Sequence, residues 1–264
     1  MVHNRSFPLL HTLQQWSALA VLALVCLGCA TPTPPGPAAD SAAPSELTPF
    51  SRLQSLDPAG PWVFWTFHRT KTPTRFQLVN VESQKVIEAR ADRSIAGLRH
   101  RVDVDPAQQP ILEWRWRANR MLDGADLRER HGDDSPVRIV LAFEGDRSTL
   151  PPSEQAFFER IKLLGGQDLP YATLMYVWCP HSELESVVAS TFTTRVQKIV
   201  VEQGPEHVGQ WRSYQRDIVA DYRRAYGKEP GRLISVGIMS DTDNTRESAQ
   251  GWFGDIHLRP RAPQ

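Results

Sequence analysis

Cysteine is scarce in this chain, which has three cysteines and eight histidines among its 264 residues. The histidines are scattered without metal-ligand spacing, and no cysteine pair exists to complete a zinc site. Cys26 and Cys29 lie within and directly after an apolar leader, so Cys179 stands alone in the remaining chain. A single thiol forms no intrachain disulfide. Because Cys179 ends an apolar run, we expect it to be a small buried hydrophobe.

The chain also lacks a charge of one sign. Its 30 lysines and arginines balance 30 aspartates and glutamates, and its isoelectric point is near 7.1. Nucleic-acid binding needs a basic field that neutralises phosphates, so the sequence does not favour it. Hydrophobic residues make up 41% of the chain, and eight residues are tryptophans. This composition argues against disorder and predicts a sizeable core.

The common catalytic signatures are missing too. The sequence has no G-x-S-x-G elbow, no phosphate-binding G-x-x-x-x-G-K-[ST] loop, no G-x-G-x-x-G and no H-E-x-x-H. These absences argue against serine-esterase chemistry, nucleotide hydrolysis and zinc-dependent hydrolysis.

The first 28 residues have the features of a secretory signal. Arg5 precedes an apolar run over residues 16–27, which is shorter than the roughly 20 residues that a membrane-spanning helix needs. Gly28-Cys29 resembles the lipobox of bacterial lipoproteins, which implies that Cys29 is lipidated. Cys26 stands where that motif usually has leucine, so ordinary cleavage or a retained signal anchor remain alternatives. Ala30 follows the cysteine, and by analogy this favours the outer membrane, facing the periplasm.

Residues 29–49 are rich in proline, alanine, serine and threonine. Such a composition buries no core and tends toward extended polyproline geometry, so we expect a semi-rigid spacer. The folded domain is expected over residues 50–264, as one unit without internal repeats.

A strand-like pattern dominates this domain. Residues 111–117 alternate cleanly, with Leu112, Trp114 and Trp116 on one face and charged side chains on the other. About ten segments of similar length predict an all-β fold, namely a two-layer antiparallel β-sandwich or jelly roll. They are residues 62–67, 76–81, 85–91, 94–103, 111–117, 138–143, 171–178, 195–202, 233–240 and 252–258. Two short helices are expected, from residue 151 to Gly165 and over residues 217–226.

The loop after the strand ending at Ser240 is rich in oxygen-bearing side chains. Asp241, Asp243 and Asn244 follow one another closely, and hard cations such as Ca²⁺ bind six to eight oxygens. Asp241 and Asp243 are therefore candidate metal ligands. The spacing is not that of an EF-hand, and the same residue types commonly form Asx turns and caps, so structural capping remains the alternative.

A second acidic loop precedes the strand that begins near Arg138. Asp133 and Asp134 end a mixed-charge stretch that starts at Asp123. A solvated loop stabilised by ion pairs is the simpler interpretation. Alternatively, Asp133, Asp134 and Arg138 present hydrogen-bonding groups to sugar hydroxyls or to an anion at a strand end.

The tryptophans also allow two interpretations. Trp114 and Trp116 share a strand face, and they are either core residues or a flat platform on which sugar rings stack. We favour the core, because Arg115 and Arg117 on the opposite face are expected to point to solvent. These two arginines are then candidate ligand contacts.

Several motifs in order resemble one uncharacterised bacterial family, the domain of unknown function numbered 3047. They are Leu112-Glu113-Trp114-Arg115-Trp116-Arg117, residues 132–139, residues 169–178, residues 221–227 and residues 239–245. The resemblance spans roughly residues 60–258 and implies no activity. Residues 251–258 also look like the terminal strand of galactose-binding-like jelly rolls, which concerns fold alone.

Two classes of function fit these features. The first is a noncatalytic envelope lipoprotein that binds a saccharide or another cell-envelope ligand. The second is a carbohydrate-active enzyme with paired carboxylates drawn from Glu113, Asp133 and Asp134, which must lie about 5 to 9.5 Å apart around a cleft. A structural or assembly role in the envelope remains a further alternative.

Overall fold

The structure is a computed structural model that describes residues 43–66, 70–165 and 168–262. The expected signal peptide, most of the proline-rich spacer and the lipidation position Cys29 lie outside these residues. Among the described residues, no helix is long and apolar enough to cross a membrane.

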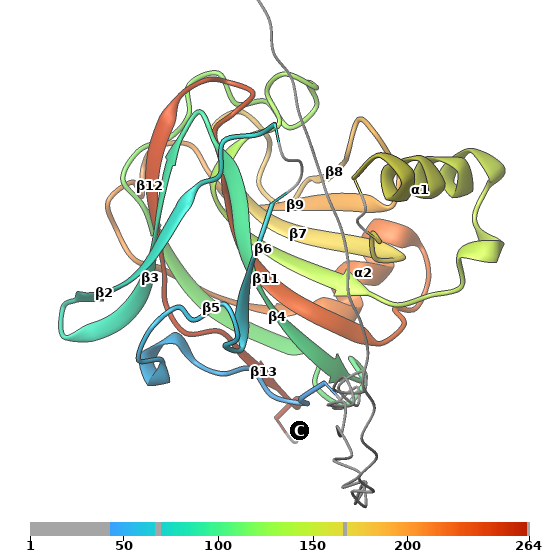
Figure 1. The fold of residues 1–264 in the computed structure, drawn as a ribbon, viewed down its shortest axis with the longest axis horizontal. Coiled ribbons are helices and arrows are strands. Elements are labelled where there is room, and N and C mark those ends of the chain that lie inside the picture. The colour runs from blue at the N-terminus through green and yellow to red at the C-terminus, as the bar shows by residue number, and fades with distance from the viewer. Residues whose placement is uncertain (1–42, 67–69, 166–167, 263–264) are drawn as a thin grey trace, which may run out of the picture. The chain divides into compact units, whose positions relative to one another are not determined.

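The described chain forms two β-sheets that pack face to face, which confirms the predicted sandwich (Figure 1). The seven-stranded sheet has the order β1 (Trp62–Trp65), β4 (Ile95–Val104), β11 (Leu233–Asp241), β6 (Ser135–Phe143), β7 (Ala172–Cys179), β9 (Val196–Gln203) and β8 (Val187–Ala189). The six-stranded sheet has the order β10 (Arg212–Asp217), β5 (Ile111–Ala118), β12 (Ser248–Phe253), β3 (Gln84–Asp92) and β2 (Arg75–Val81), with β13 (His257–Arg259) also paired to β5.

One strand pair departs from the predicted antiparallel arrangement. The strand β9 runs parallel to β7, while the short strand β8 pairs antiparallel with β9 at the sheet edge. The chain therefore leaves β7, forms the edge strand first and returns between the two. Every other strand pair recorded in the described residues is antiparallel.

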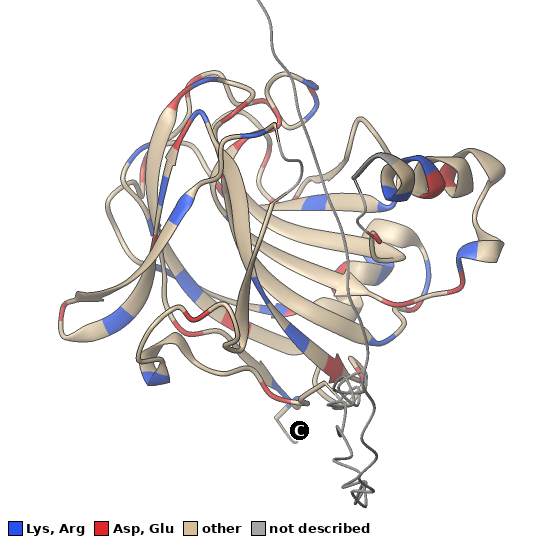
Figure 2. Ribbon diagram, viewed as in Figure 1, with Lys and Arg blue, Asp and Glu red and all other residues tan. Residues whose placement is uncertain are grey.

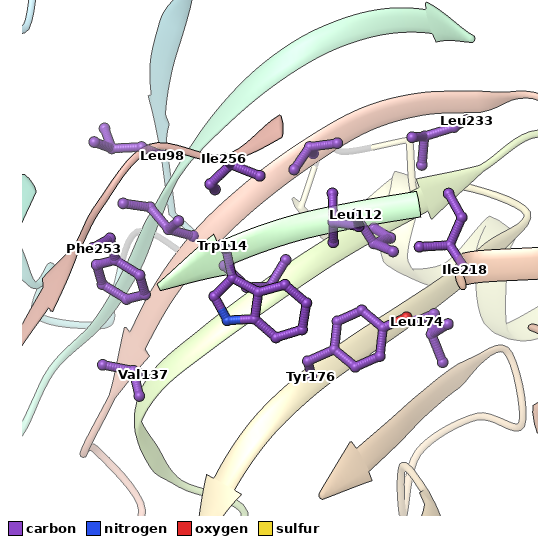
Figure 3. Close-up of a cluster of buried hydrophobic side chains, with 14 of the residues drawn as sticks. Leu98, Leu112, Trp114, Val137, Leu174, Tyr176, Ile218, Leu233, Phe253 and Ile256 are labelled. Atoms are coloured by element: carbon purple, nitrogen blue, oxygen red, sulfur yellow. The ribbon is translucent and has the colours of Figure 1, made fainter. Parts of the chain in front are cut away.

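The core lies between the two sheets and contains the tryptophans of β5. Trp114 and Trp116 are 3% and 0% exposed, which confirms the prediction that they are core residues. The Trp114 ring stacks on Tyr176 from the opposite sheet, with ring centroids 4.9 Å apart (Figure 3). Because β5 alternates, its charged residues must face away from this core.

The two predicted helices are present. The helix α1 covers Pro152–Gly165 and α2 covers Ile218–Tyr226. The Asp217 carboxylate accepts from two backbone amides at the start of α2, and Gly227, with φ of 69°, ends it in the left-handed conformation. Two single 3₁₀ turns complete the elements, at Phe50–Arg52 and Arg147–Thr149.

Strand boundaries were harder to predict near the C-terminus. The single strand expected over residues 252–258 is two strands, β12 and β13, separated at Gly254–Ile256. The strand β10 was not expected, because its residues Arg-Ser-Tyr-Gln-Arg-Asp carry one aromatic among polar side chains. Cys179 is fully buried, as predicted.

Candidate functional site

The charged face of β5 forms part of the outer surface of the six-stranded sheet. Leu112, Trp114 and Trp116 belong to the central core, so Glu113, Arg115 and Arg117 project from the opposite side of the strand. On the neighbouring strand β10, Ser213 lies opposite Arg115 and Gln215 opposite Glu113. Both β10 side chains are exposed, and they share this outer surface.

The two arginines of β5 stack on tryptophans from adjacent segments. The Arg115 guanidinium carbon lies 4.6 Å from the Trp211 ring centroid. The Arg117 guanidinium carbon lies 5.2 Å from Trp211 and 4.3 Å from Trp252. We call these four residues the Trp–Arg ladder. Since two guanidinium groups already contact Trp211, its ring is not an open platform for sugar stacking; the groups presented to a ligand are the arginine edges.

Beside the ladder lies a wide groove of about 860 Å³, which we call the outer groove. It extends from the β2–β3 turn across β5 and β10 to the β12–β13 connection. Most of the groups that line it donate or accept hydrogen bonds. Its lining residues are Ser51, Asn80, Ser83, Gln84, Lys85, Glu113, Trp114, Arg115, Ser213, Tyr214, Gln215, Asp255 and His257.

The acidic side chains of the outer groove are already engaged. Glu113 forms an ion pair with Arg259. The Asp255 carboxylate accepts from the Ser51 backbone amide at 2.9 Å and from the Ser51 hydroxyl at 2.6 Å. The groove therefore offers no acid that is free of an internal partner among its described lining residues.

Arg115 is held in place by neutral groups. Its terminal N–H donates to the Gln84 side-chain oxygen, and its guanidinium lies on Trp211. Gly254 makes room for it, because a Cβ at that position would lie 2.6 Å from Arg115 Cγ. Among the described residues, no carboxylate forms an ion pair with Arg115.

The other predicted site residues gather elsewhere. The loop of residues 119–134 covers the outer surface of the seven-stranded sheet, where its Leu127 packs with Met175 and Val177. It meets the loop of residues 241–247, whose Glu247 carboxylate accepts from the backbone amides of Asp123 and Gly124. Acidic and basic segments alternate over the loops at the top of Figure 2.

Asp134 joins these two loops. It is fully buried, and its carboxylate accepts from the Asn244 side-chain amide at 2.9 Å and from the Thr245 backbone amide and hydroxyl at 2.7 and 2.8 Å. These donors come from a segment about 110 residues further along the chain. Asp134 therefore fixes the 241–247 loop to the start of β6.

Arg138 and Lys198 neutralise the acids beneath the 119–134 loop. Arg138 is 3% exposed and lies 3.2 Å from an Asp133 oxygen and 3.5 Å from an Asp241 oxygen. Lys198 is fully buried and pairs with the other Asp133 oxygen. Burial lowers the pKa of the Lys198 ammonium, while Asp133 opposes that shift. We call Asp133, Asp134, Arg138, Lys198, Asp241 and Asp243 the buried charge cluster.

Asp241 and Asp243 are the candidate metal ligands, and the structure brings them within 4.8 Å of Asp134. Burial raises the pKa of the Asp241 carboxyl well above its usual range, and Arg138 only partly opposes this. The neighbouring Asp134 carboxylate also raises the pKa of Asp241, through its charge and a side-chain hydrogen bond. The Asp243 carboxylate accepts from Lys71. Each of the three carboxyl groups thus has an internal partner. The Asp243 backbone amide also donates to the Asp241 carboxyl at 3.5 Å, a long contact of the Asx-turn type.

The acids considered for paired-carboxylate catalysis do not share a cleft. Glu113 lies on the outer surface of the six-stranded sheet, whereas Asp133 and Asp134 lie against the outer surface of the seven-stranded sheet. The thickness of the sandwich separates them. Hence the structure brings Asp133, Asp134, Arg138, Asp241, Asp243 and Asn244 together, but it places Arg115 and Arg117 on the other side.

Sequence reasoning missed several residues of both regions. Lys198 directly precedes the apolar run Ile199–Val201 of β9, a signal that points to a buried ionic partner. Trp211 directly precedes β10, a strand that the sequence pattern did not predict. No local pattern therefore indicated that Trp211 lies beside Arg115 and Arg117. Gly254 interrupts an apolar run, which is a signal for close backbone approach.

Comparisons with known proteins give little about function. Among solved structures, the chain is similar to a family 30 carbohydrate-binding module of a cellulosomal cellulase of Clostridium thermocellum (9% identity, 84% of this chain and 96% of that one, TM-score 0.32). It is also similar to endoglucanase 3 of Trichoderma harzianum, from family GH12 (8% identity, 76% of this chain and 96% of that one, TM-score 0.38). A third similar structure is the xyloglucanase domain of NopAA, a type three effector from Sinorhizobium fredii (7% identity, 76% of this chain and 97% of that one, TM-score 0.34).

These identities and TM-scores carry no conclusion about a ligand or a reaction. No curated protein matches the sequence. The family comparison is specific: residues 60–257 match the model of a protein family of unknown function, DUF3047. Since this match spans most of the chain and confirms the resemblance found in the motifs, the chain belongs to the DUF3047 family.

Proposed function

We propose that this chain is a noncatalytic binding module of the bacterial cell envelope, and that its outer groove takes up a saccharide or another hydroxyl-rich envelope component. The observation that carries the proposal is the outer groove itself, a broad concavity lined by hydrogen-bonding side chains on the rigid strands β5 and β10. Its volume of about 860 Å³ lies within the range of about 300 to 1,000 Å³ that is typical of ligand sites.

The chemistry of the lining fits a saccharide. Asn80, Gln84 and Gln215 offer amides, and Ser83 and Ser213 offer hydroxyls. Such groups both donate and accept, so they match sugar hydroxyls, which do the same. Because the backbone that carries these side chains lies in paired strands and a tight turn, it is in place before a ligand arrives, which lowers the entropic cost of binding.

The engaged acids support a binding role over catalysis. A general acid or nucleophile must reach the substrate, whereas Glu113 and Asp255, the acids of the groove, are held by Arg259 and Ser51. The groove thus resembles a recognition surface more than a reaction centre.

The place of the module in the cell is part of the proposal. The leader and Gly28-Cys29 support a lipid anchor at Cys29, followed by the proline-rich spacer, with the domain held at the outer membrane and facing the periplasm. Expression with a labelled fatty acid tests the anchor. We expect label in the wild-type chain and none in Cys29→Ser; label in both would contradict an anchor at this cysteine.

Binding is tested by thermal shift and calorimetry of the purified chain against envelope glycans, including peptidoglycan fragments. A ligand at 100 times its dissociation constant stabilises the folded state by about 2.7 kcal/mol, which raises the melting temperature of a domain of this size by roughly 5 to 10 °C. If no glycan produces a shift or a binding isotherm, the proposal fails.

A further inference from the structure

Arg115 and Lys85 are the arginine and lysine that line the outer groove, and neither has an acidic partner among the described residues. The Lys85 ammonium donates to the Leu53 carbonyl at 2.9 Å, whereas Arg115 presents a planar guanidinium. Trp211 supports the plane of its guanidinium, Gln84 accepts one of its N–H groups, and the absence of a side chain at Gly254 leaves room for its stem. Stacking on an indole fixes the plane and leaves the edge of the guanidinium pointing outward. The edge donors beyond the one that Gln84 takes are thus available to a ligand.

The charges around the outer groove do not balance. Among lysine, arginine and acidic side chains, Arg115 and Lys85 line the groove together with Glu113 and Asp255, and Arg259 adds a third cation through its ion pair with Glu113. One positive charge therefore remains uncompensated. It lies on the six-stranded sheet, away from the buried charge cluster, where every acid and base has a partner.

We infer that the ligand of the outer groove is an acidic saccharide, a sugar that bears a carboxylate, and that the carboxylate binds to the edge of Arg115. This inference rests on the proposed saccharide-binding function and narrows its ligand class. Arg115 is the residue that determines specificity, while Ser213 and Gln215 on the neighbouring strand lie where hydroxyls of the same sugar reach them.

The charge count favours a carboxylate over a phosphate. Arginine binds both groups through paired N–H donors. A carboxylate carries one negative charge, which balances the one net positive charge of the groove. A phosphate monoester carries nearly two, and the excess would face the carboxylates of Glu113 and Asp255 in the same groove.

The direct test compares three forms of one ligand with the full wild-type chain. Calorimetry measures the affinity for an oligosaccharide that carries one uronate carboxylate, for its methyl ester, and for the same oligosaccharide with a phosphate monoester in place of the carboxylate. We expect the acid to bind about 10- to 100-fold more tightly than the ester, because a charge-assisted hydrogen bond pair is lost in the ester. The preference should shrink as salt is raised from 50 to about 500 mM.

Two variants of Arg115 locate the preference. Arg115→Gln should remove the difference between acid and ester. Arg115→Lys should keep a reduced preference, since it retains the charge without the planar fork. The matched control is Arg223→Gln, an exposed arginine of α2 paired with Glu229, and it should keep the full preference. Melting curves of all variants verify that they fold, and the wild-type comparison does not depend on any variant.

The outcomes separate this inference from the function on which it rests. Equal affinity for acid and ester, or a preference that survives in Arg115→Gln, overturns the carboxylate assignment and leaves saccharide binding intact. Tighter binding of the phosphorylated form reassigns the anion and also overturns it. If these three probes do not bind but another neutral glycan does, the acidic-sugar inference fails alone. If no saccharide binds at all, both proposals fail.

Discussion

Two regions of this molecule gather charged side chains, and they differ in whether those charges have partners within the protein. The buried charge cluster lies beneath the 119–134 loop, where Arg138 and Lys198 face Asp133 and Asp241 and little water reaches them. The outer groove lies on the opposite sheet, where Arg115 is ordered by neutral groups. Charges that are all paired internally serve the architecture, whereas an ordered charge without an acidic partner is available to a ligand.

The largest expected effect separates the two regions by stability. Arg138→Met removes the buried cation that lies within 3.5 Å of Asp133 and Asp241 and leaves Lys198 as the remaining base of the buried charge cluster. Breaking this buried pair should cost about 3–5 kcal/mol of unfolding free energy. Arg115→Met is the control on the other sheet, with an expected loss of about 0.5–1 kcal/mol in the free protein. Denaturation in guanidinium chloride measures both. Equal losses would contradict the division between an architectural region and a binding region.

A second effect concerns pH. The pKa of Asp241 is raised by burial, so folding favours its protonated form. This contribution to stability is fully present below the ordinary carboxyl pKa of 3.8 and is lost as pH rises through the raised pKa. Asp241→Asn cannot lose a proton. The unfolding free energy of the wild type, relative to this variant, should therefore fall above pH 3.8, by about 1.4 kcal/mol for each unit of pKa difference.

Urea denaturation of both proteins across pH checks this prediction. If the unfolding free energy of the wild type instead rises relative to that of Asp241→Asn as pH increases, then Arg138 dominates and Asp241 is ionised in the folded state.

A smaller effect is expected at the Trp–Arg ladder. Arg117→Met removes two contacts with tryptophan rings, and such contacts contribute about 0.5–1 kcal/mol each at exposed sites. A total loss near 1–2 kcal/mol, measured by thermal unfolding, is therefore expected. A loss of unfolding free energy as large as that of Arg138→Met would show that the Trp–Arg ladder supports the fold as strongly as the buried charge cluster does.

The smallest expected effect tests for a cation. Asp134, Asp241 and Asp243 lie close enough to hold one, but each already has an internal partner. The double variant Asp241→Asn with Asp243→Asn should lower the melting temperature equally in calcium-containing buffer and in chelator. A larger loss in calcium would show that an ion is held there and that the capping interpretation is incomplete.

The sequence predicted the features that depend on local pattern. The alternation of residues 111–117 placed Trp114 in the core and Arg115 outside, because strand periodicity alone decides this. Capping residues and glycines likewise located the two helices.

Features that depend on distant pairing were out of reach. Asp134 finds its donors at Asn244 and Thr245, and Asp133 finds Lys198 across the sheet. No local pattern encodes which loops meet. The same holds for Trp211, whose partners come from the neighbouring strand. The candidate residues were therefore identified as one group, while the structure divides them between two surfaces.

We expect the ligand to bind in the outer groove and not at the buried charge cluster. The most direct measurement is the binding isotherm of a glycan with Ser213→Trp, which fills the groove from an exposed position beside Arg115. Ser153→Trp, at an exposed position at the start of α1, is the matched control. We predict that Ser213→Trp abolishes binding with its melting temperature unchanged, while the control binds like the wild type. Wild-type affinity in Ser213→Trp would contradict the claim.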